Sequence, residues 1–286
     1  MKLLSLSGGA TKFVGILSCA QAVIDNGFKP THISGVSAGA IAALPLALGL
    51  YPEAKEKGLN LSLKDLFSSL PIKDNGKLTL NAVGRLLIGK TSLGIQETGK
   101  LVKTIITRYM FDKYKDGNYA ECFLLAVNFS TGERVLFSVK DGNYKDYLDA
   151  VSASSHLPIL SQPVEIDGEF YYDGGLRDHN PGSVTLDRIK GFNEVVSIYS
   201  RPKENTNVSE EWKDSFFEVL MRTIDIMNIE ISKTDEQLEF EFCKQNKIKL
   251  NQYFLPNILT SLFDVDKTRL LELSSKSYDI GSKYKM

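Results

Sequence analysis

The chain has few cysteines and no large excess of charge of either sign. Its 286 residues include only three cysteines, Cys19, Cys122 and Cys243, which are odd in number and widely spaced. This pattern argues against a disulfide framework and against a cysteine-based zinc site. The formal net charge is -1, so the chain lacks the basic excess that marks nucleic-acid-binding proteins.

Long hydrophobic runs are also absent. No stretch approaches the roughly 18 apolar residues that a membrane-spanning helix needs. The apolar opening of the chain ends at Gly8 and Gly9, too early for the core of a secretory signal. Hydrophobic residues make up 43% of the chain and charged residues 24%, as in ordinary soluble enzymes. We therefore expect a cytoplasmic protein, and we leave open export by a route without a cleaved signal.

The first fifty residues alternate between short apolar segments and segments with helical spacing. The expected elements are a strand at 2–7, a helix at 13–24, a strand at 31–34 and a helix at 38–48. The glycine that follows Asn26 is a natural end for the first helix. This alternation predicts an α/β fold in which helices cover a mainly parallel sheet.

The rest of the chain separates into an inserted segment, a second group of strands and a C-terminal part. Residues from about 51 to 110 look helical and contain no convincing strand, which indicates a helical insertion. The later elements expected are strands at 122–128, 134–139, 164–166, 170–172, 194–200 and 248–255, and helices at 144–152, from 209 onward and at 265–283. We interpret the chain as one domain, with a core at 1–200 and a mainly helical part at 201–286.

A candidate nucleophile lies where the second strand meets the second helix. The residues from Gly35 to Gly39 read Gly-x-Ser-x-Gly, with Ser37 at the centre. A strand before this motif and an Ala-rich helix after it are the setting of a nucleophile elbow, in which the glycines let strand and helix approach closely. The helix N-terminus adds positive potential where an oxyanion would form. The alternative is an ordinary turn that Ser37 caps.

A loop of small residues between the first strand and the first helix is a candidate oxyanion site. It contains Gly8, Gly9 and Ala10, whose backbone N–H groups could stabilise a tetrahedral intermediate. The patterns Gly-x-Gly-x-x-Gly and Gly-x-x-x-x-Gly-Lys are absent, which argues against a phosphate-binding loop. A plain tight turn is the remaining alternative.

Ser37 needs a proton acceptor, and Asp173 is the favoured one. Asp173 follows the expected strand at 170–172 and precedes two glycines, so the strand holds its backbone while the chain turns away behind it. A turn residue would have the same sequence context. The chain has three histidines, and a Ser-Asp-His triad would combine Ser37 and His179 with Asp173 or Asp178.

Taken together, these motifs resemble the patatin-like phospholipase family. The blocks that carry the resemblance occur in family order over roughly residues 1–200, at 4–10, 32–40, 153–158, 172–176 and 180–181. The resemblance implies a three-layer α/β/α fold and a dyad in which Ser37 is the nucleophile and Asp173 the base. It also implies hydrolysis of fatty-acyl esters of phospholipids or neutral glycerolipids without calcium.

The chain departs from the family pattern in the donor loop. The family usually has Gly-Gly-Gly-x-Arg/Lys-Gly, whereas this chain has Ala10 at the third glycine and Phe13 after Lys12. Ala10 keeps its N–H group, but Phe13 makes the start of the helix bulkier. The acid motif reads Asp-Gly-Gly, a recognised variant of Asp-Gly-Ala.

The sequence therefore predicts a serine lipid acyl hydrolase of the phospholipase A type, with neither metal nor cofactor. Its substrate would be a phospholipid or another acyl lipid, and contact with a membrane surface is left open. Apolar residues of the insertion are candidates for a wall or lid of the lipid site: Leu59, Leu61, Leu66, Phe67, Leu70, Leu86, Leu87 and Ile88. Two alternatives share these motifs, namely an inactive relative that binds lipid or a protein, and an acyltransferase.

Overall fold

A mixed sheet with mostly parallel strands forms the centre of the structure. The computed structural model describes residues 1–71, 78–204 and 216–285. The strands of the sheet are β1 (Lys2–Leu6), β2 (His32–Val36), β5 (Glu121–Asn128), β6 (Arg134–Ser138), β7 (Val164–Ile166), β8 (Glu169–Asp173), β9 (Glu194–Tyr199) and β10 (Lys249–Phe254). Each strand is hydrogen-bonded to the next in the order β10-β9-β1-β2-β5-β8-β7, and β6 also pairs with β5. The strands from β10 to β5 are parallel, whereas β6, β7 and β8 pair antiparallel.

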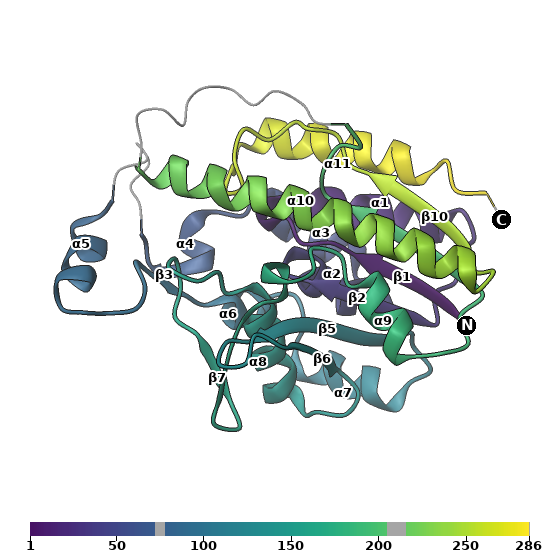
Figure 1. Cartoon of the computed structure of the whole chain (residues 1–286), viewed down its shortest axis with the longest axis horizontal. Helices are drawn as coiled ribbons and strands as arrows, with labels where there is room; N and C mark the ends of the chain where they lie inside the picture. The colour runs from purple at the N-terminus through teal and green to yellow at the C-terminus, as the bar shows by residue number, and fades with distance from the viewer. Residues whose placement is uncertain (72–77, 205–215, 286) are drawn as a thin grey trace.

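Helices cover both faces of this sheet. They are α1 (Phe13–Asp25), α2 (Ala38–Leu48), α3 (Tyr51–Leu59), α7 (Arg108–Asp116), α8 (Tyr144–Ser155), α9 (Gly182–Arg188), α10 (Phe216–Gln245) and α11 (Lys267–Gly281). Figure 1 shows α9 and α10 in front of the strands, with α1 and α2 behind them. The alternation of side chains along β1 explains this division, because neighbours on a strand point to opposite faces. Leu4 and Leu6 belong to the large core with α1 and α2, and Leu3 packs with Leu186 of α9 on the other face.

The α/β fold, its layered arrangement and the mainly parallel sheet confirm the sequence prediction. Asp167 and Gly168 form the turn that joins β7 to β8, and both residues have positive φ, 53° and 81°. Such angles are typical of the two-residue turns that match the twist of a hairpin. The helix expected from residue 209 is described only from Phe216, and its first residues lie outside the described part of the chain.

The prediction that the insertion contains no strand was wrong. Besides α4 (Leu63–Leu66), α5 (Leu80–Leu87) and α6 (Thr98–Lys103), residues 51–110 hold β3 (Phe67–Ser69) and β4 (Ile95–Gln96). These two strands pair with each other, antiparallel, and form a separate small sheet. β3 has three residues and β4 has two, which is too short for an alternating pattern to predict a strand. Across the described ranges, no helix combines the length and the apolar character needed to cross a bilayer.

Candidate active site

Ser37 occupies a strained turn between β2 and α2. Its backbone has φ 55° and ψ -118°, a combination that non-glycine residues rarely adopt and that occurs at functional turns. The turn is tight on both sides, because a Cβ at Gly35 would lie 2.3 Å from the carbonyl oxygen of Gly39. A Cβ at Gly39 would lie 2.3 Å from the carbonyl oxygen of Leu6 on β1. Only glycine fits at either position, and we refer to this turn, residues 35–39, as the elbow.

A serine of α8 holds the elbow in place. The N–H of Ser37 donates to the carbonyl oxygen and to the Oγ of Ser154, each at 3.0 Å. Ser154 Oγ in turn donates to the carbonyl oxygen of Leu125 on β5, at 2.6 Å, and the side chain is fully buried. Ser154 therefore ties the strained backbone to the neighbouring strand. Sequence reasoning placed this residue in a family block without giving it a role.

The register of β5 explains how Asp173 reaches Ser37. β2 runs parallel to β5 and its last residue, Val36, pairs with Leu125. β8 runs antiparallel to β5, and its last residue, Asp173, pairs with Ala126. β6 pairs with residues 123–127 of β5 along one edge. The other edge is shared by β2, which pairs with residues 121–125, and β8, which pairs with residues 126–128. The C-terminal ends of β2 and β8 therefore meet. The residue after Val36, Ser37, therefore faces Asp173, and the two side chains are close enough for the Ser37 hydroxyl to stabilise the Asp173 carboxylate.

The environment of Asp173 changes its acidity. The carboxylate is 2% exposed, and this burial raises its pKa from 3.8 to about 6. Hydrogen bonds from Ser37 and from the N–H of Gly175 act in the opposite direction, the second at 2.8 Å. Burial disfavours the charged form, and these donors favour it. The balance leaves a carboxylate that is ionised near neutral pH and more basic than an exposed aspartate.

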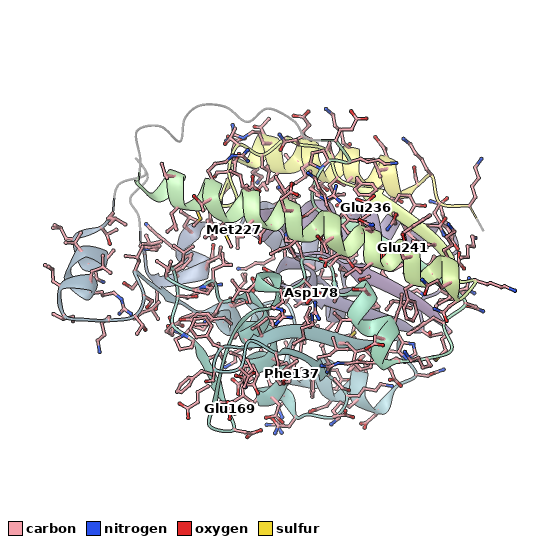
Figure 2. All side chains as sticks on the ribbon, in the orientation of Figure 1. Phe137, Glu169, Asp178, Met227, Glu236 and Glu241 are labelled. Atoms are coloured by element: carbon pink, nitrogen blue, oxygen red, sulfur yellow. The ribbon has the colours of Figure 1, made fainter. Side chains whose placement is uncertain are left out.

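His156 and Asp178 have other partners. Nδ1 of His156 lies 3.0 Å from the carbonyl oxygen of Gln162, and Asp178, labelled in Figure 2 between α10 and the sheet, pairs with Arg134. Burial, Lys12 and Arg201 lower the pKa of His179 to about 3, and burial lowers that of His156 to about 4. Within the described residues, no hydrogen bond joins Ser37 to a histidine.

The donor loop divides the three predicted N–H groups into two kinds. The N–H of Gly8 already donates to the carbonyl oxygen of His179, at 2.9 Å, and the Gly8 carbonyl accepts from Ser200 Oγ. Gly8 therefore holds the loop in place. Its N–H group is already used in this bond, which argues against the oxyanion-donor role predicted for it. No partner for the N–H of Gly9 or Ala10 is found in the part of the chain that the structure describes. These two groups are available to a ligand.

The two departures from the family pattern are both accommodated. Ala10 has φ 46°, in the left-handed region that favours glycine, so its methyl group is tolerated at some cost. Phe13 is 6% exposed and belongs to the large core. Its ring lies against Gly58 of α3, where a Cβ would come within 2.9 Å of it. A small residue on α3 thus makes room for the large one at the start of α1.

An apolar pocket opens beside Ser37. It is lined by side chains from both the core and the insertion, among them Phe13, Ile41, Leu66, Leu101, Leu157 and Phe263. Leu61, another expected wall residue, also lines it, whereas Leu86, Leu87 and Ile88 are exposed on and after α5. Ala10 and Ala38 reach the same pocket. A nucleophile-like serine, free N–H groups and an apolar hollow therefore share one site.

The site offers no obvious set of metal ligands. Among residues 1–71, 78–204 and 216–285, no three His, Cys, Asp or Glu side chains gather in a group that could hold a metal ion.

Lys12 lines a second, smaller hollow with Arg201, Asp225 and His179 on the donor-loop side. Burial lowers the pKa of Lys12, and Asp225 partly offsets this effect.

Comparison with known proteins identifies relatives in sequence and in fold. The chain is 22% identical over 238 residues to the probable lipid hydrolase 463L of Invertebrate iridescent virus 6, covering 77% of each chain. Its fold is similar to that of VipD from Legionella pneumophila, with a TM-score of 0.54 at 14% identity. That alignment covers 98% of this chain and 65% of the VipD chain. The model of the patatin-like phospholipase family matches residues 4–185, and the chain therefore belongs to this family.

Proposed function

We propose that this protein is a lipid acyl hydrolase in which Ser37 is the nucleophile and Asp173 its general base. The observation that carries the proposal is the strand register, which brings Ser37 and Asp173 together with Ser37 at the wall of an apolar pocket. Membership of the patatin-like phospholipase family supports lipid ester hydrolysis in general. The name of the viral relative, a probable lipid hydrolase, points the same way.

In the first step, Asp173 takes the proton of the Ser37 hydroxyl while Oγ bonds to the carbonyl carbon of the ester. The carbonyl oxygen becomes an oxyanion, and the N–H groups of Gly9 and Ala10 are free to stabilise it. Ala38 adds a third donor, because the first N–H groups of a helix have no partner within the helix. The bond to the leaving alcohol then breaks, and Asp173 returns the proton to that alcohol.

In the second step, water hydrolyses the acyl enzyme. Asp173 takes a proton from the water as its oxygen bonds to the acyl carbon, and the bond to Ser37 Oγ breaks. The proton returns to Ser37, and the fatty acid leaves. Throughout both steps the acyl chain lies in the pocket formed by Leu66, Leu101 and Leu157, where apolar burial favours it.

The test is hydrolysis of a phospholipid and of a soluble short-chain ester by purified protein. Ser37→Ala and Asp173→Asn should each lower the rate at least about a thousandfold, since the two groups act as a unit. Ser130→Ala, which changes an exposed loop serine, is the matched control. The rate of the wild type should rise with pH through about 6 as Asp173 ionises, and EDTA should not change it.

Labelling with a fluorophosphonate separates this proposal from its alternatives. The wild type should be labelled and Ser37→Ala should not. Lipid binding without labelling or turnover would instead identify an inactive lipid-binding relative. Transfer of the acyl group to an added alcohol in preference to water would identify an acyltransferase.

A further inference from the structure

α5 carries an apolar surface that the rest of the structure leaves uncovered. Leu80 is 85% exposed, Leu87 81% and Ile88 71%, and Val83 and Leu86 are exposed as well. Leu80, Val83 and Leu87 follow the i, i+3, i+7 spacing that normally faces a core. Scattered exposed leucines are common, but such a stripe on one short helix marks an interaction surface.

α5 is nevertheless fixed to the body of the protein, because the side-chain amide of Asn81 donates to the Oγ of Ser69 on β3, at 2.9 Å. Thr79 caps its N-terminus by accepting from the N–H of Ala82, at 3.0 Å. Arg85 holds the loop after the helix by donating to the carbonyl oxygen of Ser92 at 2.9 Å and to its Oγ at 2.8 Å. The helix therefore has one face held against the protein while the apolar stripe faces away. Figure 1 shows α5 projecting at the left end of the molecule, clear of the sheet.

The surface lies next to the pocket beside Ser37. The buried side of α5, Ala82, packs in a small cluster with Leu93, Leu160 and Met221. Leu157 and Phe263 border this cluster and also line the pocket. The buried side of α5 is therefore connected to the pocket through this one cluster, and the exposed stripe lies on the other side of the helix.

The charges of this segment have one sign. Residues 78–96 contain Arg85 and Lys90 and no aspartate or glutamate. Arg85 is engaged with Ser92, whereas Lys90 is exposed just after the end of the helix. A lysine at the edge of an apolar stripe can extend its charged end to lipid phosphates while the leucines enter the acyl region. The combination fits an anionic bilayer better than a protein interface, where lysine is depleted relative to the rest of the surface.

We propose that α5 is the surface by which this protein docks on anionic phospholipid bilayers. Leu80, Leu87 and Ile88 enter the membrane, and Lys90 lies at the level of the headgroups. The consequence for catalysis, delivery of lipid to the adjacent pocket, rests on the proposed hydrolase function, whereas the docking itself does not depend on it.

The test is flotation of the full chain with vesicles of phosphatidylcholine, alone or mixed with phosphatidylglycerol. All proteins carry Ser37→Ala, so that no vesicle is degraded. Leu80→Ser combined with Leu87→Ser should weaken binding at least about tenfold, because two inserted side chains are lost. The matched control combines Leu238→Ser with Leu271→Ser, which are 49% and 47% exposed on α10 and α11, and it should bind like the parent. Lys90→Glu should weaken binding to the mixed vesicles only.

Equal flotation of the α5 variant and its parent would overturn the proposal. So would size-exclusion chromatography in which the parent is a dimer and the α5 variant a monomer, because a second copy would then cover the stripe. In the active background, the α5 variant should hydrolyse vesicle lipid more slowly and a soluble short-chain ester at the parent rate. If the Ser37→Ala parent floats but the wild type hydrolyses neither substrate, the proposed function is wrong and the docking stands.

Discussion

The elbow and α5 are opposite kinds of structure within one chain. At the elbow, a Cβ on Gly39 would come within 2.3 Å of a backbone oxygen, whereas a Cβ on Gly84 in α5 would meet nothing within 4 Å. The elbow is held by backbone hydrogen bonds and close contact, and α5 by one cap, one arginine and a small cluster. Chemistry requires atoms fixed to a fraction of an ångström, and contact with lipid requires apolar surface and space.

Gly39→Ala should have the largest effect of any small change. The added methyl group would overlap the carbonyl of Leu6, which is backbone and cannot turn aside. We expect loss of soluble protein, or a loss of stability above about 4 kcal/mol, as for severe overpacking of a core. Expression and thermal unfolding beside the wild type would measure it. A variant that unfolds at the wild-type temperature would mean that the strand and helix can separate at no cost.

Asp173→Asn should change the stability by an intermediate amount, and it should raise the stability where Gly39→Ala lowers it. The folded pKa of Asp173, about 6, lies above its ordinary value of 3.8, so the folded state binds more protons between these values. Stability therefore falls as pH rises through this window, and the full cost of ionisation is present above pH 6. The difference between these two pKa values corresponds to about 3 kcal/mol.

Asparagine keeps an acceptor for Gly175 and never ionises, so the inactive variant should be more stable than the wild type by about 2–3 kcal/mol at pH 8. The advantage should disappear at pH 4. Urea unfolding at both pH values measures the difference, and Asp141→Asn, at an exposed position, is the control. An equal difference at both pH values would show that it does not come from ionisation.

The elbow and α5 also differ in how much of their structure the sequence alone predicts. The elbow was predictable because strand, glycine, serine, glycine and helix follow one another without a gap, so local signals and tertiary structure agree. The hairpin at Asp167 and Gly168 was predictable for the same reason. Both features are determined by residues that are close together in the sequence.

Features that depend on distant pairing were not predictable. The meeting of Ser37 with Asp173 depends on how two strands share one edge of β5, and motif order gave only the expectation that they meet. The bond from Gly8 to the His179 carbonyl joins residues that no local pattern relates. The leucines of α5 have the spacing of a core-facing helix, and periodicity cannot tell a face that meets protein from one that meets another surface.

Gly84→Ala should have the smallest effect, and it places the same substitution in the opposite setting. An added methyl group in α5 meets no atom, and alanine stabilises a helix interior relative to glycine by about 0.5–1 kcal/mol. Because α5 has few attachments, this gain should appear in its local opening more than in global unfolding. Amide hydrogen exchange within residues 80–88 should slow about two- to fivefold, with little change in the melting temperature. If these amides instead exchanged only with global unfolding, α5 would be as firmly held as the elbow, and the contrast between the two regions would be one of exposure alone.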